Sequence, residues 1–86
     1  MIKLTEEQLN IIKNSFSLPY YNEFEFDLEE MKSNIKKEID EITALQLIEY
    51  VDTRFIEHGL VDDEPNKFGR DMEMIRDHIY YSLKDQ

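Results

Sequence analysis

The chain of 86 residues contains no cysteine, only two glycines and only two prolines. Without cysteine it can form no disulfide, no thiolate nucleophile and no zinc site with sulfur ligands. The shortage of glycine and proline argues against a many-stranded sheet, because such a sheet needs frequent turns. No apolar run approaches the roughly 18 residues of a membrane span, and the N-terminus lacks the apolar run of a signal peptide. We therefore expect a cytoplasmic protein with no membrane contact.

Basic residues are scarce relative to acidic ones. The sequence has 20 Asp and Glu against 10 Lys and Arg, which gives a formal net charge of -10. Binding to nucleic-acid phosphates or to an anionic membrane needs clustered Lys and Arg, so direct binding of either is disfavoured. A charge of this sign suits a basic protein partner, or it serves solubility alone.

Motifs for catalysis and for metal binding are also missing. His58 and His78 stand in neither H-E-x-x-H nor E-x-x-H spacing, and no serine lies in a G-x-S-x-G turn. The acidic run at residues 62–64 lacks the alternating ligands and the central glycine of an EF-hand loop. No glycine-rich phosphate loop is present. We therefore predict a chain that is not an enzyme and that carries no metal and no cofactor. His58 is expected to complement the dipole of a helix end, and His78 to lie at the surface or its boundary.

Hydrophobic periodicity predicts an all-α fold: a single domain over residues 1–86 built as a small bundle of about four short amphipathic helices. A capping box of Thr5 and Gln8, flanked by Leu4 and Leu9, predicts a first helix over residues 6–15. Pro19 forbids its continuation. The residues expected to be buried by this helix are Leu9, Ile12 and Phe16.

The stretch YYNEFEFDLEE, residues 20–30, permits two interpretations. Phe24, Phe26 and Leu28 alternate with acidic residues, which is the two-residue period of a short strand. Beyond it, apolar residues recur at the longer spacing of a helix, at Phe24, Leu28, Met31, Ile35, Ile39 and Ile42. We favour a second helix capped near Asn22, with a break at residues 40–43. Phe24, Leu28 and Met31 should then be buried, and Glu25 and Glu29 should face water.

Two more helices complete the predicted bundle. A capping box beginning at Thr43 starts a helix that ends at His58, followed by Gly59 as a left-handed cap residue and by a loop over residues 61–66. Its expected core positions are Ala44, Leu47, Ile48, Val51 and Phe55. The last helix has its apolar stripe at Phe68, Met72, Ile75, Ile79 and Leu83.

The tyrosine pairs and the acidic runs are the candidate binding residues. Buried tyrosine rings pack while their hydroxyl groups reach water. Alternatively, tyrosine is enriched among binding hot spots, and acidic neighbours pair with Lys or Arg of a partner. The predicted partner-binding residues are Tyr20, Tyr21, Glu23, Glu25, Glu29, Glu30, Asp62, Asp63, Glu64, Tyr80 and Tyr81.

The run Asp77-His78-Ile79-Tyr80-Tyr81 is similar to the Asp-x-Ile-Tyr-Tyr run of the immunity proteins of colicin DNases, which are acidic four-helix domains. Here Ser82 stands where that family has a proline, and the run lies at the C-terminus rather than before a final helix. The resemblance and the composition together suggest a stoichiometric inhibitor. The first hypothesis is a small acidic protein that neutralises a basic protein partner, as a toxin immunity protein or antitoxin-like inhibitor does. The alternatives are a DNA-mimicking or polymerase-directed regulator, for example phage-encoded, and a structural or assembly subunit acting as a homodimer through the stripe of the second helix.

Overall fold

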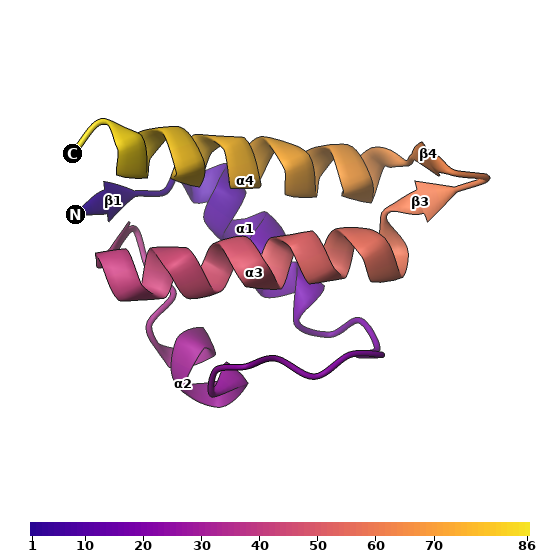
Figure 1. The fold of residues 1–86 in the computed structure, drawn as a ribbon, viewed down its shortest axis with the longest axis horizontal. Helices are drawn as coiled ribbons and strands as arrows, with labels where there is room; N and C mark the ends of the chain where they lie inside the picture. Colours follow the sequence, from indigo (N-terminus) through magenta and orange to yellow (C-terminus); the bar gives the residue numbers. More distant parts are fainter.

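Two long antiparallel helices form the frame of the molecule (Figure 1). They are α3 (Glu41–His58) and α4 (Lys67–Lys84), and strands β3 (Leu60–Val61) and β4 (Glu64–Pro65) connect them as a hairpin. Helix α1 (Glu6–Ser15) crosses behind this pair, and the short helix α2 (Leu28–Ser33) lies beside α3 (Figure 1). Strand β1 (Ile2–Lys3) pairs antiparallel with β2 (Glu38–Ile39). The computed structural model describes residues 1–86 and is mostly helical, but it is not all-α, because it contains two small strand pairs.

The first helix begins where its capping box predicts. The hydroxyl of Thr5 accepts the backbone N–H of Gln8 at 3.1 Å, and the Gln8 side chain accepts the backbone N–H of Thr5 at 3.0 Å. These two bonds satisfy N–H groups that a helix N-terminus otherwise leaves unpaired. Leu9 and Ile12 are buried, whereas Phe16 is only partly buried and lies just beyond the helix end at Ser15.

The predicted second helix is wrong in its extent. The observed α2 has only six residues, with Asp27 rather than Asn22 as its N-cap. The chain before it is irregular, with bends at Asn22, Glu25 and Phe26, and the chain after it forms β2, in which Ile39 pairs with Ile2. Non-local pairing has therefore overridden a helical spacing. Met31 is buried, but Phe24 and Leu28 are only partly buried, and Ile42 is exposed.

The third helix begins earlier than predicted. Asp40, not Thr43, is its N-cap, since the Asp40 carboxylate accepts the backbone N–H of Thr43 at 2.7 Å. This bond, with the side-chain contacts of Thr43, holds the pKa of Asp40 below its ordinary value. Ala44, Leu47 and Val51 are buried as expected.

Two predictions at the end of this helix are also wrong. Gly59 has φ of −93° and is not a left-handed cap residue. The predicted loop at residues 61–66 contains the β3–β4 hairpin, in which Val61 pairs with Glu64. Asp62 and Asp63 have φ of 51° and 66°, so they form the two-residue turn that matches the twist of a hairpin. Asn66 then caps α4, accepting the backbone N–H of Gly69 at 2.8 Å.

One core joins all four helices and the β1–β2 pair. Its residues are Ile2, Leu4, Leu9, Ile12, Met31, Ile35, Ile39, Ala44, Leu47, Tyr50, Val51, Met72, Ile75 and Ile79. Ile48, Phe55, Phe68 and Leu83 pack against it while partly exposed. A membrane-crossing helix would have to be longer or more apolar than any of the helices present.

Candidate partner-binding surface

The side chains of the segment between α1 and α2 alternate between the core and the solvent. The ring of Phe24 stacks on the buried Tyr50 with centroids 5.6 Å apart, and Phe26 lies 5.1 Å from Phe24. Glu23 and Glu25, at the intervening positions, are exposed. The two-residue period of the sequence therefore appears as alternating burial along an irregular segment that bends at Asn22, Glu25 and Phe26, with its aromatic side chains toward the core and its acidic side chains toward solvent.

Two carboxylates of α3 hold the backbone of this segment. Oε2 of Glu57 accepts the backbone N–H of Tyr21 at 2.8 Å and the side-chain amide of Asn22 at 3.0 Å. Oε2 of Glu49 accepts the backbone N–H of Glu25 at 3.3 Å. An irregular chain outside helices and sheets lacks regular backbone partners for its N–H groups, and these carboxylates supply them. The acidic face is thus held in one conformation by the fold itself.

Arg54 organises the turn by which the chain leaves α1. Its side chain is fully buried, and its guanidinium lies 3.9 Å from the centroid of the Tyr20 ring. The guanidinium donates to Oε1 of Glu57 at 2.6 Å. It also donates, at 2.8–2.9 Å, to three backbone carbonyl oxygens: Ser15, Leu18 and Pro19. One buried cation therefore satisfies the carbonyl groups of an irregular turn and anchors it to α3.

Glu57 is charged under ordinary conditions. Burial acts to raise the pKa of its carboxyl, but the hydrogen bonds from Tyr21, Asn22 and Arg54 outweigh burial and bring the pKa below its ordinary value. The prediction from sequence did not identify Arg54 or Glu57. A signal was present, because Arg54 lies on the buried face of α3 between Val51 and Phe55, where a charge needs a buried partner.

The exposed end of this segment rests on His58. Nε2 of His58 donates to the backbone carbonyl of Pro19 at 2.7 Å, and the ring of Tyr21 lies 5.3 Å from the imidazole. His58 is the last residue of α3, as its predicted role at a helix end requires, and it also fixes the segment. His78 is partly exposed and donates in the same way to the carbonyl of Lys3 at 2.7 Å.

The structure brings some of the predicted binding residues together along one stretch. Tyr21, Glu23 and Glu25 are exposed on the irregular segment before α2. Glu29 and Glu30 are exposed on the first turn of α2, where Glu29 forms an ion pair with Lys32 at 3.1 Å. We call the exposed side chains of these residues the acidic ridge: Tyr21, Glu23, Glu25, Glu29 and Glu30. Tyr20 is not part of it, because its ring is partly buried and its hydroxyl donates to the carbonyl of Phe16 at 3.3 Å.

The other predicted residues lie elsewhere. Asp62, Asp63 and Glu64 are exposed at the tip of the β3–β4 hairpin. Tyr80 and Tyr81 are exposed near the C-terminal end of α4, at the opposite end of that helix (Figure 1). Their rings contact each other edge to face with centroids 5.6 Å apart. The eleven predicted residues therefore occupy three regions instead of one surface.

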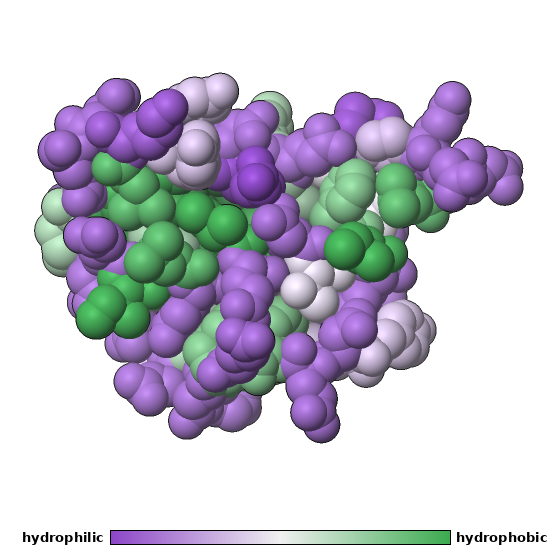
Figure 2. All heavy atoms as spheres, viewed as in Figure 1, coloured by the Kyte–Doolittle hydropathy of each residue, from purple (hydrophilic) through white to green (hydrophobic).

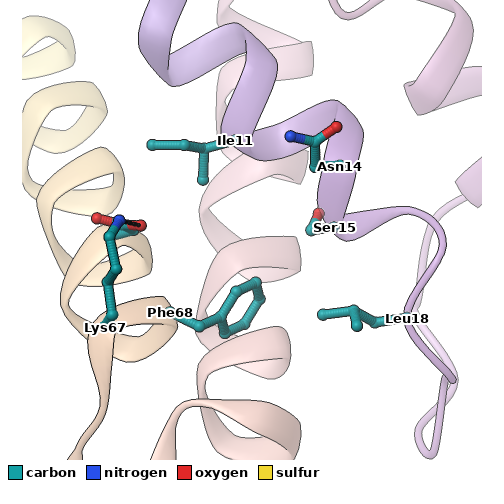
Figure 3. A pocket seen from close by; sticks show the side chains of 7 residues that line it. Ile11, Asn14, Ser15, Leu18, Lys67 and Phe68 are labelled. Carbon is teal, nitrogen blue, oxygen red and sulfur yellow. Dashed lines mark hydrogen bonds and ion pairs between the residues drawn. The ribbon is translucent and has the colours of Figure 1, made fainter.

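A shallow hollow of about 350 Å³ lies between α1 and the start of α4. Figure 3 shows the ring of Phe68 directed from α4 toward Leu18, with Ile11 of α1 above it. Its polar rim includes Lys67 and Asp71, which are already paired with each other at 3.0 Å. Asn14 and Ser15 complete the lining. No set of free polar groups converges on this hollow, so its chemistry selects no particular ligand.

No three His, Asp or Glu side chains are grouped as a metal ion would require. Comparisons with family models, with curated proteins and with solved structures found no match to this chain.

Proposed function

We propose that the chain is a binding protein that neutralises a basic protein partner, and that it docks through the acidic ridge. The observation that carries this proposal is the fixed conformation of the irregular segment before α2. Its backbone is held by Glu49 and Glu57, and its aromatic side chains pack inward on Tyr50. The acidic side chains have no comparable structural contact apart from the Glu29–Lys32 pair.

A preformed acidic surface favours binding for two physical reasons. A segment that is already ordered loses little further conformational entropy when a partner binds. A cluster of negatively charged carboxylates also attracts a positively charged partner and raises its association rate. Between residues 20 and 33 the sequence has five acidic residues and only one basic residue, Lys32. The ridge is therefore negative whatever its local pairing.

Neutralisation of a basic toxin is the form of this function that we favour. Nucleases present basic surfaces to their substrates, so a small acidic protein can cover such a surface by charge complementarity. Tyr21 supplies an aromatic group beside the acids, as hot spots often do. The Tyr80–Tyr81 pair lies away from the ridge and is not needed for this docking.

Affinity capture from cells that encode the chain, with proteins identified by mass spectrometry, tests the proposal. The variant is Glu23→Lys/Glu25→Lys, and its matched control is Glu6→Lys/Glu7→Lys in the first turn of α1. Each reversal adds two charges, so each pair takes the net charge from -10 to -6. We expect the wild type and the control to capture a basic protein. The ridge variant should capture at least about tenfold less of that protein.

The captured protein, once purified, gives the decisive measurement. Its own activity should fall to baseline at one equivalent of the wild-type chain, and its association rate should drop for the ridge variant alone. Equal loss in both variants would mean that total charge, not the ridge, governs binding. If both variants capture as much of the partner as the wild type does, the ridge is not the docking site.

A further inference from the structure

The α3–α4 pair is covered by another helix on one side only. Helix α1 crosses behind the pair, and no other element covers the opposite side (Figure 1). The uncovered side exposes three large apolar side chains of α3: Ile42 by 69%, Leu45 by 55% and Ile56 by 69%. None of them belongs to the core, because α3 buries a different set of residues. Figure 2 shows apolar atoms toward both ends of this side, with hydrophilic atoms between them.

The three apolar side chains lie on one seam of α3. Residues 42, 45, 49, 52 and 56 follow each other at alternating steps of three and four, which is the spacing at which one helix packs lengthwise on another. From residue 42 to residue 56 the helix rises about 21 Å, or about four turns. The seam therefore has the length and spacing to receive a further helix of about four turns, as apolar helix surfaces do in other complexes.

The middle of this seam is acidic. Glu49 and Asp52 occupy its two central positions, and Glu73 and Asp77 are exposed on the neighbouring α4. The only cation among them is Arg76, whose guanidinium lies 2.8 Å from Asp52 and 3.6 Å from Asp77. Glu49 and Glu73 form no ion pair. The centre of the uncovered side thus carries four carboxylates against one guanidinium, which is already paired.

Charge decides which partner this surface accepts. We call the surface the outer face, and its residues are Ile42, Leu45 and Ile56 with Glu49, Asp52 and Glu73. A second copy of the chain would bring the same surplus of carboxylates, so self-association is opposed. Nucleic acids and anionic lipid surfaces are repelled for the same reason. The complementary partner has Lys or Arg opposite the central carboxylates and apolar side chains on either side of them.

We propose that the outer face binds an amphipathic helix of a basic protein partner. The apolar side chains of that helix pack on Ile42 and Leu45 at one end and on Ile56 at the other. Between these ends, its Lys or Arg side chains reach Glu49 and Glu73, which gives both carboxylates the cationic partners that they lack. The apolar contacts supply affinity, and the central charges fix the register and exclude acidic helices. The proposal does not depend on docking at the acidic ridge, because the two surfaces share no residue.

A synthetic helical peptide of about 18 residues tests the proposal. The patterned peptide carries Leu at the spacing of residues 42, 45 and 56 and Arg at the spacing of residues 49 and 52, on a background of Ala and Gln. The control peptide has the same composition, but its Leu and Arg are distributed around the helix, and circular dichroism verifies that both peptides are helical. Fluorescence anisotropy at about 150 mM salt, which screens distant charges, should give a Kd below about 100 μM for the patterned peptide. The control peptide should bind at least about tenfold more weakly.

Two exposed apolar positions locate the peptide on the protein. Leu45→Gln should weaken binding of the patterned peptide at least about tenfold, because it removes an apolar anchor. Met74→Gln should change the affinity by less than about twofold, since residue 74 lies about 200° around α4 from residue 76. Both positions are exposed, by 55% and 58%, so neither change disturbs the core.

A matched pair of charge reversals tests the central carboxylates. Glu73→Lys should weaken binding of the patterned peptide at least about fivefold, whereas Glu7→Lys in the first turn of α1 should leave its affinity within about twofold. Each reversal takes the net charge from -10 to -8, so total charge cannot cause the difference. Glu73 is a cleaner test than Glu49, because Glu49 also accepts the backbone N–H of Glu25.

Amide chemical shifts measured by NMR show where the patterned peptide lies. We expect shifts along residues 42–56 and 73–77 and none along residues 21–30. Loss of affinity in Glu23→Lys/Glu25→Lys alone would assign the peptide to the acidic ridge and overturn the proposal. Shifts of the outer face that depend on the concentration of the protein alone, without peptide, would assign the face to a second copy. Equal binding of the two peptides, or no binding of either, would also overturn the proposal.

Discussion

Arg54 and Glu57, three residues apart on α3, form an ion pair of 2.6 Å whose side chains are 0% and 1% exposed. Between them they contact the segment that carries the acidic ridge at the carbonyls of Ser15, Leu18 and Pro19 and at the N–H of Tyr21. A buried ion pair is costly to desolvate and gains little over an apolar pair in stability alone. Here the pair satisfies the backbone of an irregular segment, which no apolar pair could do.

Substitution of Arg54 should therefore destabilise the fold strongly. Arg54→Met keeps most of the side-chain volume but removes the only cation paired with Glu57 and the guanidinium donors to the carbonyl groups of Ser15, Leu18 and Pro19. We expect the free energy of unfolding to fall by about 3–5 kcal/mol, the usual cost of breaking one partner of a buried pair. Urea unfolding followed by circular dichroism measures it. The exposed pair of Lys67 and Asp71 is the control, because Lys67→Met should cost less than about 1 kcal/mol. Similar losses in the two variants would show that Arg54 is not an anchor.

Low pH should weaken the same Arg54–Glu57 pair. The pKa of Glu57 is lower in the folded protein than in the unfolded chain, where it is about 4.3. Its contribution to stability is therefore complete above about pH 4.3 and is lost as the pH falls through the folded value. Unfolding free energies measured by urea between about pH 3 and 7 should fall on the acid side. Glu57→Gln should make that slope shallower by up to about 1.4 kcal/mol per pH unit, the effect of one proton.

The control for this titration is Glu23→Gln, which removes an exposed carboxylate with no structural partner. A Glu57→Gln limb as steep as the wild type would mean that other carboxylates, not Glu57, cause the acid loss.

The sequence predicted the elements that rest on local interactions. The capping box at Thr5 predicted α1, and the apolar stripe of Met72, Ile75 and Ile79 predicted α4. Both signals depend only on residues a few positions apart in the chain. The same reasoning failed between Phe24 and Ile39. That stretch has a helical spacing, but its conformation is set by Glu49, which accepts the backbone N–H of Glu25, and by the pairing of Ile39 with Ile2, both distant in the chain.

The candidate surface shows the same difference between features set by local sequence and features set by long-range contacts. The exposure of Glu23, Glu25 and Glu29 follows from their charge and could be predicted. The fixed path of the backbone could not, because it depends on hydrogen bonds to residues of α3, more than twenty positions away. The Tyr20–Tyr21 pair illustrates the limit: two adjacent tyrosines are equivalent in the sequence, yet one packs under Arg54 and the other faces water.

Truncations in α2 should distinguish the real core from the predicted stripe. Met31 is fully buried, whereas Leu28 is only partly buried. Met31→Ala should reduce the free energy of unfolding by about 2–5 kcal/mol. Leu28→Ala should cost less than about 2 kcal/mol, because part of its side chain is in water in the folded protein. Urea titrations of both variants give the comparison, and equal costs would contradict the partial burial of Leu28.

Gly69 offers a test in which packing and helix propensity predict opposite signs. A Cβ at this position would collide with the carbonyl oxygen of Gly59, at the end of α3 next to the hairpin. Propensity alone would make Gly69→Ala stabilising by about 1 kcal/mol. We expect it to destabilise the protein by about 1–3 kcal/mol, since the backbone of Gly59 must move. Met74→Ala, at an exposed site of the same helix, should change stability by less than about 0.5 kcal/mol. A stabilised Gly69→Ala variant would disprove the close approach.

The hairpin turn should be improvable at Asp63. With φ of 66°, this residue occupies the left-handed region, which glycine adopts at no steric cost and alanine adopts poorly. Asp63→Gly should raise the free energy of unfolding by up to about 1 kcal/mol, and Asp63→Ala should lower it by about as much. Both substitutions remove the same negative charge from the run of residues 62–64, so relief of repulsion contributes equally to the two variants. The difference between their melting temperatures therefore measures the backbone conformation alone, and variants of equal stability would mean that residue 63 does not hold a left-handed turn in solution.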